Sequence, residues 1–102
     1  MNGLQAQQFD ALGDATRRLL LERLRGGPLP VVDLAANLPI SRPAVSQHLR
    51  VLKDARLVRV RSAGVRRIYE IDRRGLESLR SYFDGFWDQA LQAFKARAEE
   101  ED

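Results

Sequence analysis

VDLAANLPISRPAVSQHLRVLKDARLVRV, residues 32–60, is the stretch that decides the fold of this chain. Its first part predicts a short amphipathic helix that ends at Pro39, and a second helix begins at Ser41 after a tight turn. The second helix presents polar and basic side chains to solvent and leads into an arginine-rich strand. Two helices joined this closely, with the second one polar on its outer face, are typical of the helix-turn-helix with which proteins read DNA.

The composition of the chain is that of one small globular domain. With 102 residues there is room for a single domain. The absence of cysteine excludes disulfides, thiol redox sensing and metal binding through thiolates. No apolar run approaches the roughly 20 residues that span a bilayer, and the N-terminus lacks the basic start and apolar block of a secretory signal. We therefore expect a cytoplasmic protein with one DNA-binding and dimerisation domain at residues 1–98 and an acidic tail at 99–102.

The charge is distributed unevenly along the chain. The net charge is +3, yet residues 41–74 contain ten basic and three acidic side chains and so carry +7, while the remainder carries −4. Positive charge concentrated over one third of a chain is typical of proteins that bind polyanions. A solvated arginine-rich surface is the alternative.

The hydrophobic pattern predicts a mainly helical fold with a two-stranded β-hairpin, the wing. Val45, Leu49 and Leu52 recur at helical spacing and should face the core. Asp14 or Thr16 should cap the second helix. The expected order of a winged helix-turn-helix is four helices, two strands and a last helix, at residues 4–12, 15–25, 31–38, 42–55, 57–61, 66–71 and 73–98, with a turn at 62–65 between the strands.

The outer face of the helix at 42–55 supplies the candidate base-reading residues. Gln47 is the best candidate, because its amide can pair with N7 and N6 of adenine together. Arg42 and Arg50 suit either guanine or phosphate, and the sequence does not separate these roles. An ordinary solvated helix face is the alternative. With the arginines of the wing, which suit phosphate or minor-groove contact, the candidate DNA-binding residues are Ser41, Arg42, Ser46, Gln47, His48, Arg50, Arg61, Arg66 and Arg67.

Two of these side chains have a second interpretation. Ser41 is also the expected cap of its helix, which is compatible with a DNA contact. His48 lies between the apolar rows of the helix, where a lone histidine is more often packed or hydrogen-bonded than a metal ligand. A contact to a DNA phosphate is its other role.

The last helix has more large aromatic side chains than a lone surface helix needs. They form either the core of a monomer or the seam of a dimer, and we favour the dimer, because two-fold DNA readers place their recognition helices about one DNA turn apart, roughly 34–36 Å. A hydrophobic ligand pocket is a further alternative that no polar anchor supports. The candidate dimer residues are Phe9, Leu12, Leu79, Phe83, Phe86, Trp87, Ala90 and Phe94.

With these residues identified, the chain resembles the ArsR family of bacterial winged-helix repressors over nearly its whole length. The matching stretches are FDALGDATRRLLLERL (9–24), VDLAANLPISRPAVSQHLRVLKDARLV (32–58) and VRVRSAGVRRIYEID (58–72). The resemblance implies a homodimer joined through its first and last helices. It also implies binding to an inverted-repeat operator in double-stranded DNA and repression of its own or a neighbouring promoter.

The chain departs from the family pattern in two places. Many members sense metals through a Cys-x-Cys pair, and the matching positions are Pro30 and Val32, which cannot bind metal. The last helix has no histidine, and its FDGFWDQAL stretch (83–91) resembles the branch that does not sense metals, so we expect no metal and no cofactor. Arg56 stands where a helix-ending glycine is usual and would be strained in a left-handed conformation.

Three rival functions follow from the same residues. The first is a protein-interaction module that has lost DNA contact, and the second is a repressor released by a small apolar effector. The third is an enzyme, which we reject because the sequence has no nucleophile–base pair, metal cluster or phosphate-cradling glycine loop.

Overall fold

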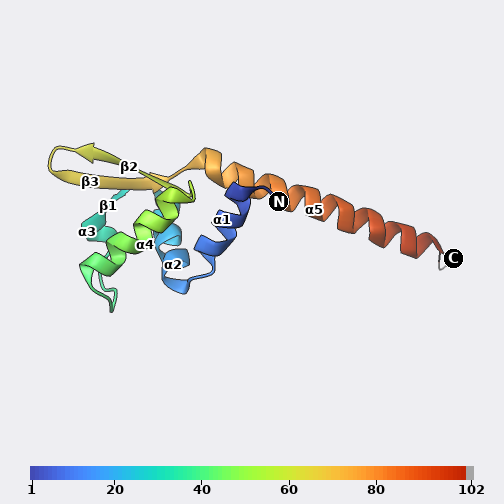
Figure 1. The fold of residues 1–102 in the computed structure, drawn as a ribbon, viewed down its shortest axis with the longest axis horizontal. Helices are drawn as coiled ribbons and strands as arrows, with labels where there is room; N and C mark the ends of the chain where they lie inside the picture. Colours follow the sequence, from blue (N-terminus) through green and yellow to red (C-terminus); the bar gives the residue numbers. More distant parts are fainter. Residues whose placement is uncertain (101–102) are drawn as a thin grey trace.

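A helical body carries the β-hairpin at one end and a long projecting helix at the other (Figure 1). The computed structural model describes residues 1–100 and measures 65 × 26 × 25 Å. In chain order the elements are α1 (Gly3–Leu12), α2 (Ala15–Arg23), the 3-10 helix η1 (Leu24–Gly26), β1 (Leu29–Pro30), α3 (Val31–Leu34), α4 (Arg42–Asp54), β2 (Val58–Ala63), β3 (Arg66–Ile71) and α5 (Arg73–Glu100).

Side-chain caps define where three of the helices begin. Asn2 and Gln5 form a reciprocal capping box on α1. Of the two candidate caps for α2, Asp14 is the one used, since its carboxylate accepts the backbone N–H of Arg17 at 3.1 Å. The predicted cap of α4 is confirmed, because the Ser41 hydroxyl accepts the backbone N–H of Ala44 at 3.3 Å.

The core lies between α2, α3, α4 and the sheet. The predicted row of Val45, Leu49 and Leu52 is confirmed, with each side chain at most 1% exposed. The other buried apolar residues of this cluster are Ala11, Leu20, Leu24, Leu34, Ala55, Leu57, Val58 and Tyr69. This core fixes α4 against the hairpin.

The sheet has three strands, so the predicted two-stranded hairpin was incomplete. Leu29 and Pro30 pair with Tyr69 and Ile68, which makes β3 the central strand in the order β1-β3-β2. Proline has no N–H to donate and is therefore confined to edge strands, which is where β1 lies. The additional strand and η1 also change the predicted order of elements.

The hairpin turn is shorter than predicted. Pairing continues to Ala63 and Arg66, so only Gly64 and Val65 remain in the turn instead of residues 62–65. Gly64 has φ 64°, as two-residue hairpin turns require.

The helix α3 ends at Leu34 and not at residue 38 as predicted. The guanidinium group of Arg23 donates to the carbonyl oxygens of Leu34 and Ala36 at 2.7 Å each. Asn37 then takes a left-handed φ of 62°. Because the carbonyls at the helix end are satisfied by Arg23, the chain leaves the helix early and turns toward α4.

The helix α5 packs on α1 and then continues past it. Gln5 and Gln8 of α1 donate to the carbonyl oxygens of Ser78 and Gly75, at 3.0 and 2.8 Å. The helix runs two residues beyond the predicted end at 98, to Glu100, and so includes the start of the predicted acidic tail. The rest of that tail, residues 101–102, lies outside the described residues.

Candidate nucleic-acid interface

The polar surface of α4 divides into two neighbouring rows. Ser46, Arg50 and Lys53 are spaced i, i+4 and i+7, so they share one face of the helix, and this face lies toward the hairpin. Gln47 is exposed on the adjoining outward face. Arg42, in the first turn, is also exposed.

The register of the hairpin places its arginines on both faces. Val60 lies opposite Tyr69 and Ser62 opposite Arg67, so Arg67 shares the inner face that packs toward α4. Arg61 and Arg66, together with Arg59, alternate onto the outer face. The three candidate wing residues are therefore not one cluster, since Arg67 is separated from the other two by the sheet.

A pocket of about 280 Å³ lies where α4 meets the inner face of the hairpin. Its charged lining consists of Arg50, Lys53 and Arg67. Lys53 and Tyr69 line it although the sequence-based set of DNA-binding residues omitted both. The i, i+4, i+7 spacing indicates Lys53 in the sequence, whereas Tyr69 shows no such signal because its place depends on strand pairing.

His48 is directed away from this pocket, toward the start of α2. Its Nδ1 lies 3.4 Å from Nη1 of Arg17 and 4.0 Å from Oδ1 of Asp14. Arginine can only donate, so Nδ1 accepts this bond and the neutral ring carries its proton on Nε2. The ring is 24% exposed, so most of its surface is covered by the protein.

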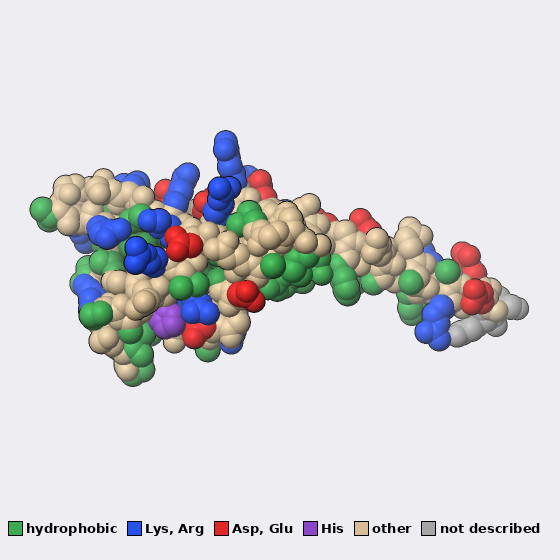
Figure 2. Space-filling model, viewed as in Figure 1, with side chains coloured by type: hydrophobic (Ala, Val, Ile, Leu, Met, Phe, Trp, Pro, Cys, Tyr) green, Lys and Arg blue, Asp and Glu red, His purple; other side chains and the backbone are tan. Residues whose placement is uncertain are grey.

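Basic side chains gather over the hairpin, α4 and the beginning of α5, and apolar ones along the projecting part of α5 (Figure 2). The only ion pair between the two strands of the hairpin, within residues 1–100, joins Arg59 and Glu70 at 2.8 Å. The positive charge of the hairpin and α4 therefore remains largely uncompensated. This end of the molecule suits a polyanion.

Four aromatic side chains of α5 are exposed in the single chain. Phe83, Phe86, Trp87 and Phe94 are 50, 62, 65 and 70% exposed. Phe9 of α1 joins them through an edge-to-face contact with Phe83, with ring centroids 5.5 Å apart.

The remaining dimer candidates differ in exposure. Ala90 is exposed, Leu12 is half-buried, and Leu79 is only 7% exposed. Leu79 thus packs mainly within its own chain.

Comparison with known proteins agrees with this geometry. Residues 14–60, from the cap of α2 into β2, match the family described as "Bacterial regulatory protein, arsR family". The HTH-type transcriptional regulator Rv2034 of Mycobacterium tuberculosis is 57% identical over 86 residues, which cover 84% of this chain and 80% of that protein. The chain belongs to the ArsR family. Its members are DNA-binding transcriptional regulators and not enzymes.

Two further ArsR-type similarities extend the comparison. The transcriptional repressor SdpR of Bacillus subtilis is 42% identical over 50 residues, covering 49% of this chain and 56% of that protein. The homodimeric winged helix-turn-helix DNA-binding domain Mb0332 of Mycobacterium bovis superimposes with a TM-score of 0.67 at 26% identity, covering 87% of this chain and 82% of that domain. The winged helix-turn-helix architecture is thus shared with a solved domain.

Residues 1–100 contain neither a cluster of metal-binding side chains nor a membrane-spanning helix. No group of three or more histidine, cysteine, aspartate or glutamate side chains is arranged to hold a metal ion. No helix in this part of the chain is long and apolar enough to cross a membrane.

Proposed function

We propose that this ArsR-family chain is a homodimeric repressor that binds an inverted-repeat operator in its own or a neighbouring promoter. The observation that carries the proposal is the exposed polar face of α4 beside a basic hairpin, within a segment of charge +7. Residues 1–98 would serve as one DNA-binding and dimerisation unit, with the acidic tail outside it. Action on DNA implies a cytoplasmic location.

Gln47 is the proposed base reader. Its exposed amide sits on the outward face of α4, and a helix of this kind enters the major groove, where adenine presents one acceptor and one donor. Arg42 and Ser41 lie at the end of α4 that approaches the base edges. Arg61 and Arg66, on the outer face of the hairpin, would hold phosphates or enter the minor groove.

Dimerisation through α1 and α5 is supported by the apolar surface left uncovered in a single chain. Phe9 of α1 lies with Phe83 and Phe86 of α5 around one pocket, and Trp87 and Phe94 are further exposed aromatic side chains of the same helix. Large exposed apolar side chains gathered in this way indicate an interaction site. The Mb0332 domain, which has the same fold, is homodimeric, and this supports a dimer of the present chain.

The proposal also includes that the chain represses transcription without a bound metal or other cofactor. The relative SdpR is described as a transcriptional repressor. The chain has no cysteine, and Pro30 and Val32 occupy the positions where thiolate pairs would bind metal in other members. Zinc and softer ions prefer sulfur and imidazole ligands, which favours a regulator that does not respond to them.

A fluorescence-anisotropy titration tests the proposal. The labelled duplex is the DNA upstream of the gene, and a scrambled duplex of equal length is the control, both near physiological salt. We expect binding to the upstream DNA at least ~10³-fold tighter, which is usual for specific readers, and saturation at two chains per site. Binding at one chain per site would contradict the dimer, and failure to bind either duplex would contradict the DNA-binding function.

Substitution Gln47→Ala tests the assignment of the base reader. It should weaken binding to the upstream DNA by about 1–3 kcal/mol and leave scrambled DNA unaffected, because only one base position loses its partner. Gln92→Ala is the matched control, since Gln92 lies on α5, on the side away from the aromatic row. Equal losses on both duplexes for Gln47→Ala would show that Gln47 does not read a base.

A further inference from the structure

We propose that the pocket between α4 and β3 is a clamp for one backbone phosphate of the bound DNA, held by Arg50, Lys53 and Arg67. This inference rests on the proposed DNA-binding function and goes beyond it by assigning a ligand group to a defined cavity. It also separates the arginine that holds phosphate from the glutamine that reads a base.

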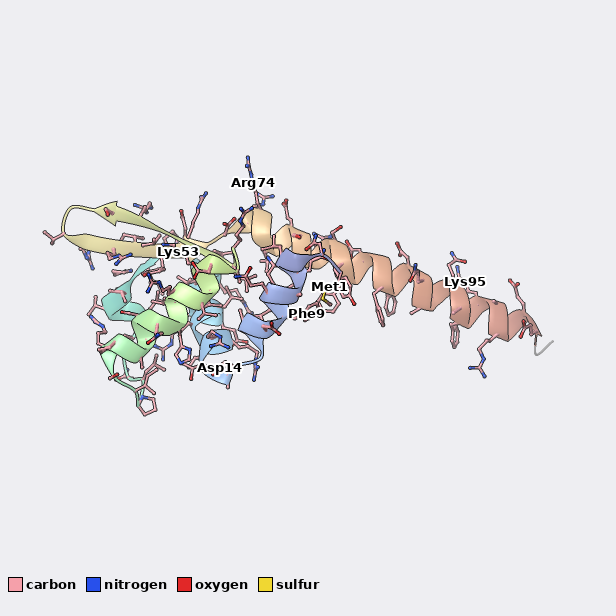
Figure 3. All side chains as sticks on the ribbon, viewed as in Figure 1. Met1, Phe9, Asp14, Lys53, Arg74 and Lys95 are labelled. Atoms are coloured by element: carbon pink, nitrogen blue, oxygen red, sulfur yellow. The ribbon has the colours of Figure 1, made fainter. Side chains whose placement is uncertain are left out.

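The helix side of the clamp follows from the spacing of α4. Ser46, Arg50 and Lys53 share one face, and each directly follows a residue of the buried row, so the packing of that row fixes their Cα positions. Lys53 lies near the end of α4, beside the hairpin (Figure 3). A hydroxyl, a guanidinium and an ammonium group are three donors that a phosphate accepts.

The hairpin side of the clamp follows from strand register. Arg67 is on the inner face of β3, two residues from Tyr69, and both line the same cavity as Arg50 and Lys53. Tyr69 is only 6% exposed and Val31, the first residue of α3, lies beside it, so these two side chains form a fixed wall. The third cation is therefore held by the sheet and not by the turn of the hairpin.

The uncompensated positive charge of the pocket favours binding of an anion. Within residues 1–100 the ion pairs between arginine and carboxylate involve Arg59, Arg73 and Arg80, and none involves Arg50, Lys53 or Arg67. Three cations around one cavity of about 280 Å³ repel one another unless an anion lies between them. A phosphate accepts from all three and is bidentate toward arginine.

The position of the pocket indicates that the phosphate belongs to DNA. Ser46 and Arg50 are exposed on the flank of α4, next to the face that carries Gln47. When α4 lies in the major groove, the phosphates nearest this flank belong to the groove edge that the hairpin also approaches. A phosphate held between helix and hairpin fixes the register of Gln47 on the bases, which is the usual role of phosphate contacts.

The test is a scan of the upstream duplex with a neutral methylphosphonate at one phosphate at a time. The wild-type chain is compared with Arg67→Gln, Lys53→Gln and the conservative Arg67→Lys. Lys95→Gln, which removes the same charge near the far end of α5, is the control (Figure 3). The substituted residues are exposed, so unfolding temperatures should match the wild type.

In this scan we expect one phosphate position in each half-site to be sensitive. A methylphosphonate at that position should weaken wild-type binding about tenfold, as the loss of a charged hydrogen bond predicts. Arg67→Gln should weaken binding to unmodified upstream and scrambled DNA about equally and lower the salt slope by roughly one unit. At that phosphate it should lose less than the wild type does, because only Arg50 and Lys53 remain to hold it. Lys53→Gln should show the same changes in affinity, salt slope and methylphosphonate effect as Arg67→Gln. Arg67→Lys should retain most of the wild-type affinity.

Three outcomes separate the possible failures. If the wild-type chain binds neither duplex, the proposed function is wrong and the clamp with it. If it binds the upstream DNA while the losses from Arg67→Gln and from each methylphosphonate simply add, the clamp is wrong and DNA binding stands. If millimolar inorganic phosphate raises the unfolding temperature of the wild type but not of Arg67→Gln, and no methylphosphonate matters, the pocket binds a free anion and the assignment to DNA is overturned.

Discussion

Asp14 joins two parts of the DNA-binding unit at the scale of a single residue. Its carboxylate caps α2 and lies 4.0 Å from Nδ1 of His48 on α4. The backbone N–H of Arg17 is the main cause that lowers the pKa of Asp14 below its ordinary value of 3.8. Burial opposes this as the second-largest effect, and the charges of protonated His48 and of Arg17 lower the pKa further. The ionised form is therefore favoured in the folded state.

This lowered pKa predicts how stability depends on pH. A carboxyl whose pKa is lower in the folded than in the unfolded state contributes stability that is complete above about 3.8 and is lost as the pH falls through the folded value. Asp14→Asn keeps a capping side chain but removes the charge. We expect wild type to unfold at a higher temperature than Asp14→Asn at pH 7, with the difference disappearing below the folded pKa. A difference that stays constant from pH 7 to pH 2 would contradict this.

The end of α4 and the start of α5 meet in a close backbone contact. The chain leaves α4 through Arg56, which takes the left-handed conformation with φ 57° although it is not a glycine. Gly75, in the first turn of α5, rests against it, and a Cβ at position 75 would lie 1.5 Å from the carbonyl oxygen of Arg56. Gly75 is therefore required for α5 to begin where it does.

Gly75→Ala should destabilise the fold by about 1–3 kcal/mol or more, because backbone atoms and not a flexible side chain must move. Urea unfolding at pH 7 measures the effect. Gly85→Ala, in the same helix, is the matched control, since a Cβ there meets nothing within 4 Å. The control should gain about 0.5–1 kcal/mol from helix propensity. Equal stability of the two variants would show that this contact is not close-packed.

The sequence was sufficient for elements whose ends depend on nearby residues. For α4, the cap at Ser41, the buried row and an end within one residue of that predicted are all local features. The end of α3 was predicted wrongly because it depends on Arg23, which is 11 and 13 positions away from its two acceptors. The strand β1 was missed because two residues are too few to show the alternation of apolar and polar side chains that marks a strand.

The residues of the candidate site were predictable from the sequence only as far as their local pattern goes. Alternation in the hairpin showed that Arg66 and Arg67 point to opposite faces of β3, but pairing with β2 and packing on α4 were needed to show which face is inward. The pocket therefore required the tertiary structure, although each of its charged residues is visible in the sequence.

At the scale of the whole molecule, charge and apolar surface are segregated along the 65 Å length. The basic hairpin and α4 occupy one end, and the exposed aromatic side chains lie along α5 toward the other (Figure 2). A second copy that covers the α5 surface would leave both basic ends free. Two recognition helices held by one rigid seam can then meet two half-sites together, so dimerisation and DNA affinity should be coupled.

A variant of the seam tests this coupling. Phe86→Ala and Trp87→Ala together should raise the dimer dissociation constant at least ~30-fold, since one central aromatic contact at an interface contributes about 2 kcal/mol or more. Both side chains are more than 60% exposed in the single chain, so its fold should persist. Sedimentation velocity reports the oligomer, and anisotropy should show a parallel loss of affinity for a two-half-site duplex but not for a single half-site. Val32→Ala, an exposed apolar residue of α3, is the control. Loss of the dimer with operator affinity unchanged would mean that each chain reads DNA alone.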